Sequence, residues 1–353
     1  MSGNPHFRFW LGTFVVFGIL LWLLSGTLTP FVLGAGIAYL LDPLADRLEG
    51  WGMRRWVAAA MILGGFFLIL ALALILLFPL LQDQVVQFIS RFPEYLRTLE
   101  ATLRPWLERL QARLPEGAIQ NIGDAAGASS GKAVEFAGNI LKNLWSGGLA
   151  VVDLLSLILI TPLVAFYMLR DWVRMLASID DMLPRRHAET IRQQARASDE
   201  IIAGFIRGQS LVCLLLGIFY AVGLTLAGLH FGLLIGFATG LLSFVPFIGV
   251  MLGCVVGLAT AFVQFDEWSR IALVAGIFAL GQFIEGNFIT PKLVGERVGL
   301  HPVWVIFALL AGGTLFGFTG VMLAVPVTAV VGVLVRFALG RYKASDYYRG
   351  PAD

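Results

Sequence analysis

The chain has 353 residues, of which 58% are hydrophobic and only 14% are charged. A typical soluble domain has about 25% charged residues, so this chain could not cover a globular surface with polar groups, and a soluble globule is excluded. Intrinsic disorder is excluded because it requires low hydrophobicity and high charge. The net charge of +2 gives no reason to expect nucleic acid as a partner. A polytopic membrane protein in contact with the lipid bilayer remains.

Four long stretches contain no Asp, Glu, Lys or Arg. They lie between residues 8 and 42, 55 and 83, 207 and 266, and 297 and 336. A membrane-spanning helix needs about 20 mostly apolar residues, and these stretches lack the period-2 alternation of barrel strands. The sequence therefore predicts an all-α polytopic membrane protein.

About eight transmembrane helices and a C-terminal hairpin are expected. The predicted spans are residues 9–25, 28–41, 57–81, 148–169, 209–228, 231–245, 247–264 and 269–288. The last apolar stretch, 303–337, is too long for one helix and contains several glycines and a proline. We expect it to fold as a hairpin that either spans or re-enters the membrane.

Lys and Arg in the short loops predict the orientation of the chain. Basic residues follow spans two, four and eight, and more of them close the chain after residue 335. With eight spans and a hairpin, all of these fall on one side. That side, and with it both termini, is predicted to be cytoplasmic.

The sequence divides into five regions. These are a three-helix membrane segment (1–81), an external amphipathic helical segment (82–147), a fourth span with a cytoplasmic amphipathic helix (148–208), a membrane transport block (209–340) and a cytoplasmic tail (341–353). Apolar residues recur at helical spacing in 82–147, with Pro93 and Pro105 as starts or kinks. That apolar face packs either on the protein's own membrane domain and the bilayer, or on neighbouring protomers.

The sequence contains no complete motif for catalysis or metal binding. Residues 127–131 read GASSG, but the strand and helix that must flank a nucleophilic serine of this type are not predicted there. The same loop lacks the first glycine and the final Ser or Thr of a phosphate-binding loop. The four histidines are scattered, and Cys213 and Cys254 are predicted to be unpaired thiols in apolar runs. We expect no enzyme activity, no metal and no cofactor.

Glycines at four-residue intervals mark two of the predicted spans. They are Gly232, Gly236 and Gly240 in the first span, and Gly249, Gly253 and Gly257 in the second. Such stripes let helix backbones approach closely inside a membrane. Between the stripes lies SFVPFIG, from Ser243 through Pro246 to Gly249, which predicts a tight hairpin and is compatible with a functional hinge.

Two segments of the transport block resemble each other. Residues 236–250 read GFATGLLSFVPFIGV and residues 317–330 read GFTGVMLAVPVTAV. Glycine- or proline-interrupted segments in corresponding positions point to a transport pathway. The likeness, which includes Gly317, Gly320 and Pro326, is either a true repeat or chance in a chain rich in Gly, Val and Leu.

Ionisable groups inside the predicted membrane region are few, and such groups usually face a cavity or a partner. Glu285 is the first candidate for transport or coupling, with Gln282 one turn before it on the same face. Asn287 would join Glu285 only if the helix broke at Gly286, and Asp153 in the fourth span is the second candidate. The alternative for Glu285 is a helix-end carboxylate paired with Lys292 or Arg297.

At these residues the chain resembles the autoinducer-2 exporter family of bacterial membrane proteins, which is also known under permease-like names. The similarity covers almost the whole chain and is strongest in SFVPFIG and in the long run from EGNFITPKLVGERVGLHP to the Val-Pro ending. The family motif positions in this chain are Pro246, Gly249, Glu285, Asn287, Pro291, Gly295, Pro302, Gly313, Gly317, Gly320 and Pro326.

The resemblance implies a bacterial inner-membrane transporter that assembles as a homo-oligomer, a pentamer. Some members are described as exporters of autoinducer-2, a small polar sugar-like molecule, and others as sodium (lithium)/proton antiporters. Three hypotheses therefore stand: proton-linked export of a small polar solute, antiport of a monovalent cation, and an oligomeric pore or structural protein. The first is preferred, with Glu285 as its coupling group.

Overall fold

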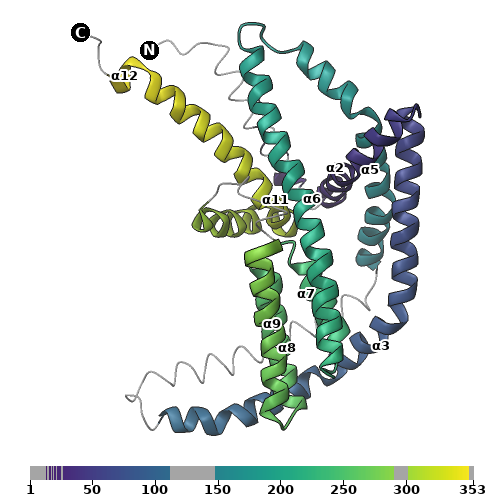
Figure 1. The fold of residues 1–353 in the computed structure, drawn as a ribbon, viewed down its shortest axis with the longest axis vertical. Helices are drawn as coiled ribbons and strands as arrows, with labels where there is room; N and C mark the ends of the chain where they lie inside the picture. Colours follow the sequence, from purple (N-terminus) through teal and green to yellow (C-terminus); the bar gives the residue numbers. More distant parts are fainter. Residues whose placement is uncertain are drawn as a thin grey trace. The chain divides into compact units, whose positions relative to one another are not determined.

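The helices follow the apolar runs of the sequence. The computed structural model describes residues 27–111, 148–289 and 301–349, with scattered positions between residues 13 and 24. In chain order, the helices are α2 (Thr29–Gly50), α3 (Arg55–Gln111), α5 (Gly148–Asp181), α6 (Ala188–Leu226), α7 (Gly232–Leu242), α8 (Ile248–Gln264), α9 (Trp268–Ile284), η2 (Glu285–Ile289), α11 (Pro302–Ala344) and α12 (Asp346–Arg349) (Figure 1). These residues contain no strand, so the all-α prediction is confirmed.

Five helical stretches within the described residues are long and apolar enough to cross a membrane. They are Arg55–Arg91, Leu155–Asp181, Ala188–Leu226, Trp268–Ile289 and Val303–Ala344. They contain the predicted third and eighth spans and the C-terminal hairpin, together with most of the predicted fourth and fifth spans, which confirms a polytopic membrane protein. The predicted span 9–25 lies largely outside the described residues, and the span 28–41 falls in α2, which is not one of the five.

Of the two neighbouring predicted spans 231–245 and 247–264, the first is shorter in the structure and the second agrees to within one residue. Helix α7 has 11 residues and α8 has 17. At 1.5 Å per residue, α7 is about 16 Å long, roughly half of the 30 Å hydrocarbon core, so it is too short to be the complete span expected over 231–245.

The polar segments are continuous with the spans. Helix α3 continues as far as Gln111, past Pro93 and Pro105, while residues 112–147 lie outside the described residues. Residues 170–207, which we predicted to be cytoplasmic and to include an amphipathic helix, form the end of α5 and the start of α6. The Arg192 side chain donates a hydrogen bond of 2.6 Å to Asp180 across the intervening turn. This ion pair joins the two long helices at their polar ends.

The chain folds into two compact units. Unit 1 consists of Met1–Phe67, Leu155–Gln209 and Thr290–Asp353, and unit 2 consists of Leu68–Leu154 and Ser210–Ile289. Within unit 1, small and branched residues pack α2, α3 and α5 together: Ala38, Leu41, Ala45, Ala59, Leu63, Ala165 and Leu169. Gly34 lies so close to Val164 that a Cβ atom would come within 2.8 Å of it. Small residues allow this close packing where lipid removes the hydrophobic drive between helices.

The glycine stripes of unit 2 lie where helices meet. A Cβ atom at Gly232, Gly236 or Gly240 of α7 would overlap the backbone of α6. A Cβ atom at Gly249 or Gly253 of α8 would overlap Ser243 and Thr239, and at Gly257 it would overlap Phe278 of α9. Helices α8 and α9 consequently lie side by side in Figure 1.

Two glutamines stabilise the turn between α6 and α7. Gln264, the last residue of α8, donates to the Gly228 carbonyl at 2.7 Å and accepts from the His230 backbone at 2.7 Å. Gln84 of α3 accepts a hydrogen bond of 3.0 Å from the Leu234 backbone in the first turn of α7. Backbone groups at helix ends have no partner within their own helix, so both glutamines satisfy polar atoms that the helices leave unpaired.

The C-terminal hairpin breaks at one glycine. Gly317 has φ 57° and ψ −138° within α11, a conformation that disfavours residues with a Cβ atom. Gly320 packs against the Gly312 carbonyl across the bend, and Figure 1 shows α11 changing direction sharply. At the start of α11, the His301 side chain accepts a hydrogen bond from the Val303 backbone and Pro302 occupies the first turn.

Candidate functional site

Glu285 lies where the geometry of its helix changes. The α-helix α9 ends at Ile284, and the π-helix η2 covers Glu285–Ile289. A π-helical turn is rare and is frequently found at functional sites. The helix does not break at Gly286, as joining Glu285 to Asn287 would have required; instead it widens there.

The Glu285 side chain is half-buried in the structure. Its Oε2 atom is buried and has no hydrogen-bond partner among the residues that the structure describes. Buried polar atoms are almost always hydrogen-bonded, and an exception calls for a water, an ion or a chemical role. The segment 290–300, which contains Lys292 and Arg297, lies outside the described residues, so the alternative of a helix-end ion pair stays untested.

A second buried polar atom, the hydroxyl oxygen of Tyr220, lies near Glu285. Tyr220 of α6 is fully buried and its ring is stacked on Phe278 of α9, with centroids 5.1 Å apart. Its hydroxyl oxygen is also buried without a partner among the described residues. The Tyr220 hydroxyl lies against Gly281, which is one helical turn before Glu285 on the same face of α9.

One face of α6 points toward this part of α9. Cys213 and Tyr220 are seven residues apart and therefore share a helix face, and both are within electrostatic range of the Glu285 carboxylate. All of these residues belong to unit 2. The arrangement places one acid, one hydroxyl and one thiol inside the membrane-spanning part of the chain. We call Glu285, Tyr220, Gly281 and Cys213 the Glu285 site.

Neither Gln282 nor Asn287 is hydrogen-bonded to Glu285 in the part of the chain that the structure describes. Gln282 is exposed, and the exposed Asn287 side chain donates to the Phe283 carbonyl of its own helix at 2.9 Å. Asp153 lies in α5 at a point where the structure does not describe side chains, and Pro291 lies outside the described residues. Tyr220 was missed because nothing in an apolar sequence distinguishes one tyrosine from its aromatic neighbours.

The predicted hinge between α7 and α8 is a closely packed turn. Ser243 donates a side-chain hydrogen bond of 2.7 Å to the Thr239 carbonyl, and Gly249 leaves no room for a Cβ atom beside Ser243. Pro246 lies in this turn, next to Phe247 with φ 69°. By contrast, Pro326 lies inside α11. The two Val-Pro segments thus have different conformations, so their sequence likeness is not a structural repeat at this step.

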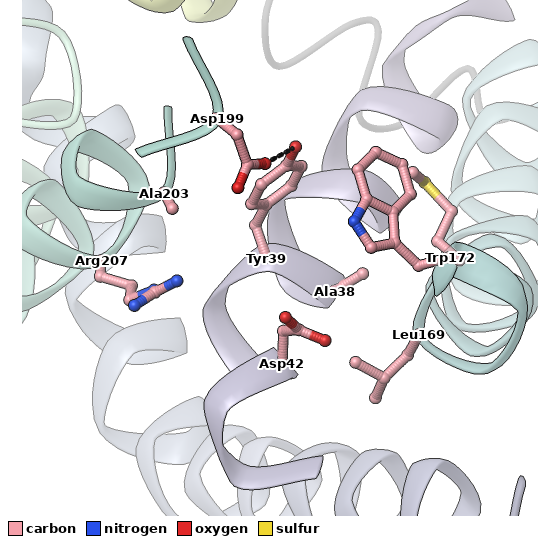
Figure 2. Close-up of a pocket in the computed structure, with 9 residues that line it drawn as sticks. Ala38, Tyr39, Asp42, Leu169, Trp172, Asp199, Ala203 and Arg207 are labelled. Atoms are coloured by element: carbon pink, nitrogen blue, oxygen red, sulfur yellow. Dashed lines mark hydrogen bonds between the residues drawn. The ribbon is translucent and has the colours of Figure 1, made fainter. Parts of the chain in front are cut away.

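A pocket in unit 1 was not predicted from the sequence. It is an open pocket with about 370 Å³ of empty space, a figure that includes open solvent, and it is lined by Ala38, Tyr39, Asp42, Met168, Leu169, Trp172, Asp199, Ala203 and Arg207. Figure 2 shows these side chains converging from α2, α5 and α6. Tyr39 and Asp42 are three residues apart and share one face of α2, which could have drawn attention to that helix. The other residues of the pocket come from α5 and α6, far along the sequence.

Arg55 is hydrogen-bonded to two residues that line this pocket, Asp42 and Leu169. Its guanidinium group donates to Asp42 at 2.6 Å and to Glu49 at 2.9 Å, and it also bonds Asp46. Its Nε atom donates to the Leu169 carbonyl of α5 at 3.0 Å. Burial and the nearby Asp46 carboxylate raise the pKa of Asp42, although Arg55 and Arg207 lower it. A single guanidinium shared among three carboxylates does not fully offset the burial of one of them.

The described residues contain no group of three or more His, Cys, Asp and Glu side chains that could hold a metal ion. The Glu285 site offers oxygen atoms of two kinds, a carboxylate and a hydroxyl. Such a pair can exchange a proton, bind water or contact a small cation.

Comparison with known proteins places this architecture in a family. The sequence pattern of the AI-2E family transporter matches residues 11–340, nearly the full length of the chain. The chain belongs to the AI-2E transporter family. The family resemblance inferred from the SFVPFIG and EGNFITP segments is thereby confirmed.

Several AI-2E relatives align along almost their whole length. The putative transport protein YrrI of Bacillus subtilis (strain 168) is 30% identical over 322 residues, covering 89% of this chain and 87% of YrrI. The putative permease PerM of Escherichia coli (strain K12) is 26% identical, covering 90% and 89%. The AI-2 transport protein TqsA of the same strain is 23% identical, covering 92% of each chain. The relatives named here are thus described as transport proteins or permeases, which agrees with a multi-pass membrane transporter.

Proposed function

We propose that this AI-2E family member is a proton-linked secondary transporter, with no enzyme activity, that exports a small polar solute. The observation that carries the proposal is the Glu285 carboxyl group, whose Oε2 atom is buried without a partner among the described residues at the start of a π-helix. Ionisable residues inside a membrane are costly and generally mark a substrate pathway or a proton relay. Glu285 is the group that would gain and lose the proton during the cycle.

The local structure supports a moving part at this position. A π-helical turn can revert to α-helical geometry by a shift of one residue in hydrogen bonding, because the two forms differ only in bonding i→i+5 or i→i+4. Such a shift would rotate Glu285 relative to the Tyr220 hydroxyl. The hinge residues Ser243, Pro246, Gly249, Pro291, Gly317, Gly320 and Pro326 would line or flex the pathway.

The solute class rests on the relatives. TqsA is named for the transport of AI-2, and we extend that solute class to this chain, together with an inner-membrane location, cytoplasmic termini and a homo-oligomeric, pentameric assembly. Composition and charge support the membrane part of this proposal, since the basic loops all fall on one predicted side.

A monovalent-cation/proton antiporter is the second candidate. The observation that favours it is that two buried oxygen atoms of the Glu285 site, one from Glu285 and one from Tyr220, have no hydrogen-bond partner among the described residues. Oxygen atoms of this kind suit hard cations such as sodium or lithium. In this version the cation and the proton would compete for the Glu285 carboxylate.

Transport in proteoliposomes containing a trapped pH dye tests both candidates. External autoinducer-2, sodium or lithium is added to the wild type, to Glu285→Gln and to the matched control Glu267→Gln. Glu267 is an exposed carboxylate just before the other end of the same helix. Proton movement driven by autoinducer-2 and lost only in Glu285→Gln supports the exporter, whereas movement driven by sodium or lithium supports the antiporter. Normal transport by Glu285→Gln across the pH range contradicts both.

A further inference from the structure

The pocket in unit 1 combines two adjacent aromatic rings, those of Tyr39 and Trp172, with negatively charged side chains. We call this pair of rings the aromatic corner. The rings of Tyr39 and Trp172 meet at 69° with centroids 5.6 Å apart. The Tyr39 hydroxyl donates a hydrogen bond of 2.8 Å to Asp199, which fixes the tyrosine ring and holds the carboxylate beside it. Figure 2 shows this bond and shows Asp42 below Tyr39 on the same helix.

The charges that line the pocket sum to a negative value. Asp42 and Asp199 contribute two negative charges and Arg207 one positive charge. Arg55 is not part of the lining, and it is shared among Asp42, Asp46 and Glu49. Trp172 and Arg207 lie on opposite sides of Tyr39 in Figure 2, so the aromatic corner is not occupied by the guanidinium. A ligand with one positive charge would neutralise the lining.

The side chains that line the pocket favour an organic cation over an inorganic one. An inorganic ion would need several oxygen ligands, but Asp42 is engaged by Arg55 at 2.6 Å and Asp199 by Tyr39. An anion would face two carboxylates. Aromatic faces next to carboxylates are the arrangement that binds quaternary and other alkyl-ammonium groups. Met168 and Leu169 add the apolar surface that the carbon atoms of such a ligand would contact.

We propose that this pocket, formed by Tyr39, Asp42, Trp172 and Asp199, binds a small organic monocation of the alkyl-ammonium class. The site lies in unit 1 and contains no residue of the Glu285 site in unit 2. The proposal therefore goes beyond the transport function and does not depend on it. Trp172 and Tyr39 supply the cation–π contacts, and Asp199 supplies the counter-charge.

Binding of tritiated choline to the full-length protein in nanodiscs tests this proposal. We expect saturable binding that unlabelled tetramethylammonium displaces. The uncharged carbon analogue of choline, 3,3-dimethylbutan-1-ol, should compete at least about tenfold less well, because cation–π attraction and charge pairing are both lost. Sodium chloride at equal ionic strength should compete no better than the uncharged analogue.

Matched variants locate the site. Trp172→Leu and Asp199→Asn should each weaken choline binding by about tenfold or more. Tyr39→Phe, which keeps the ring but loses the bond to Asp199, should weaken it less. The controls are Trp268→Leu and Asp181→Asn, which alter an exposed tryptophan and an exposed aspartate outside the pocket, and Glu285→Gln; all three should bind as the wild type does.

Several results would overturn the proposal. These are no saturable binding by the folded wild type, equal competition by the uncharged analogue, displacement by sodium as effective as by tetramethylammonium, or unchanged binding in both Trp172→Leu and Asp199→Asn. Thermal melting and size-exclusion profiles establish that each variant is folded. If Trp172→Leu does not fold, Asp199→Asn and Tyr39→Phe carry the test. Loss of transport in Glu285→Gln with choline binding retained separates this site from the proposed transport function.

Discussion

The hydroxyl group of Tyr220 lies directly against Gly281, and glycine leaves room for it because it has no Cβ atom. A Cβ atom at position 281 would come within 2.6 Å of the Tyr220 ring and would overlap the hydroxyl. Since Tyr220 is fully buried and stacked on Phe278, its ring cannot simply move away. Gly281 therefore positions the Tyr220 hydroxyl one turn from Glu285.

Gly281→Ala is expected to destabilise the protein by about 1–3 kcal/mol, the usual cost of forcing extra volume into a packed core. The displaced Tyr220 should also lower transport. The matched control is Gly276→Ala in the same helix, where a Cβ atom meets nothing within 4 Å. There, the better helix propensity of alanine should leave stability unchanged or raise it by up to about 1 kcal/mol. Thermal unfolding of both variants checks this, and equal melting temperatures would contradict the packing described for Tyr220.

Tyr220→Phe should separate stability from function. The hydroxyl is buried without a partner among the described residues, and burying an unsatisfied polar group costs about 1–3 kcal/mol. Removing it should leave the free energy of unfolding unchanged or raise it, while proton-linked transport falls because the second oxygen of the Glu285 site is lost. Thermal melting and the dye assay are measured on the same preparation. A clear loss of stability would mean that the hydroxyl is hydrogen-bonded, and unaltered transport would remove Tyr220 from the mechanism.

The contact between Gly240 and Gly217 is asymmetric. A Cβ atom at Gly240 would overlap the Gly217 backbone, whereas a Cβ atom at Gly217 would lie 3.6 Å from the Gly240 Cα atom, an ordinary van der Waals contact. Gly240→Ala should therefore push α7 away from α6 and cost about 1–3 kcal/mol, while Gly217→Ala should be tolerated. Comparing the melting temperatures of the two variants tests the geometry, because a stripe that merely needs small residues would respond equally to both.

The sequence predicts the helices well because their apolar runs are long. Glu285 was identified for a similar reason, since a carboxylate stands out in an uncharged stretch. Tyr220 does not stand out among phenylalanines and leucines, and its relation to Glu285 depends on how α6 packs on α9. The pocket could not be predicted for the same reason, because Tyr39 and Asp199 are far apart in the sequence and only the tertiary fold brings them together. The short length of α7 was missed because Pro246 marks the turn, while the helix already ends at Leu242.

The charge balance around Arg55 predicts an unusual pH dependence. Burial and Asp46 raise the pKa of Asp42 despite Arg55, so the ionised carboxylate is less favourable in the folded state than in the unfolded chain. Its contribution to stability is therefore fully present below the unfolded pKa and is lost as the pH rises through the folded pKa. Asparagine cannot ionise and does not carry this penalty.

Asp42→Asn should consequently be at least as stable as the wild type at about pH 8, and the difference should shrink as the pH is lowered towards the titration range of aspartate, near 4. Thermal melting of both proteins across this range measures the effect. Asp46→Asn is the control, because it also removes an Arg55 contact but at a more exposed carboxylate. A variant less stable than the wild type at pH 8 would show that the attraction of Arg55 for Asp42 outweighs the cost of burying its charge.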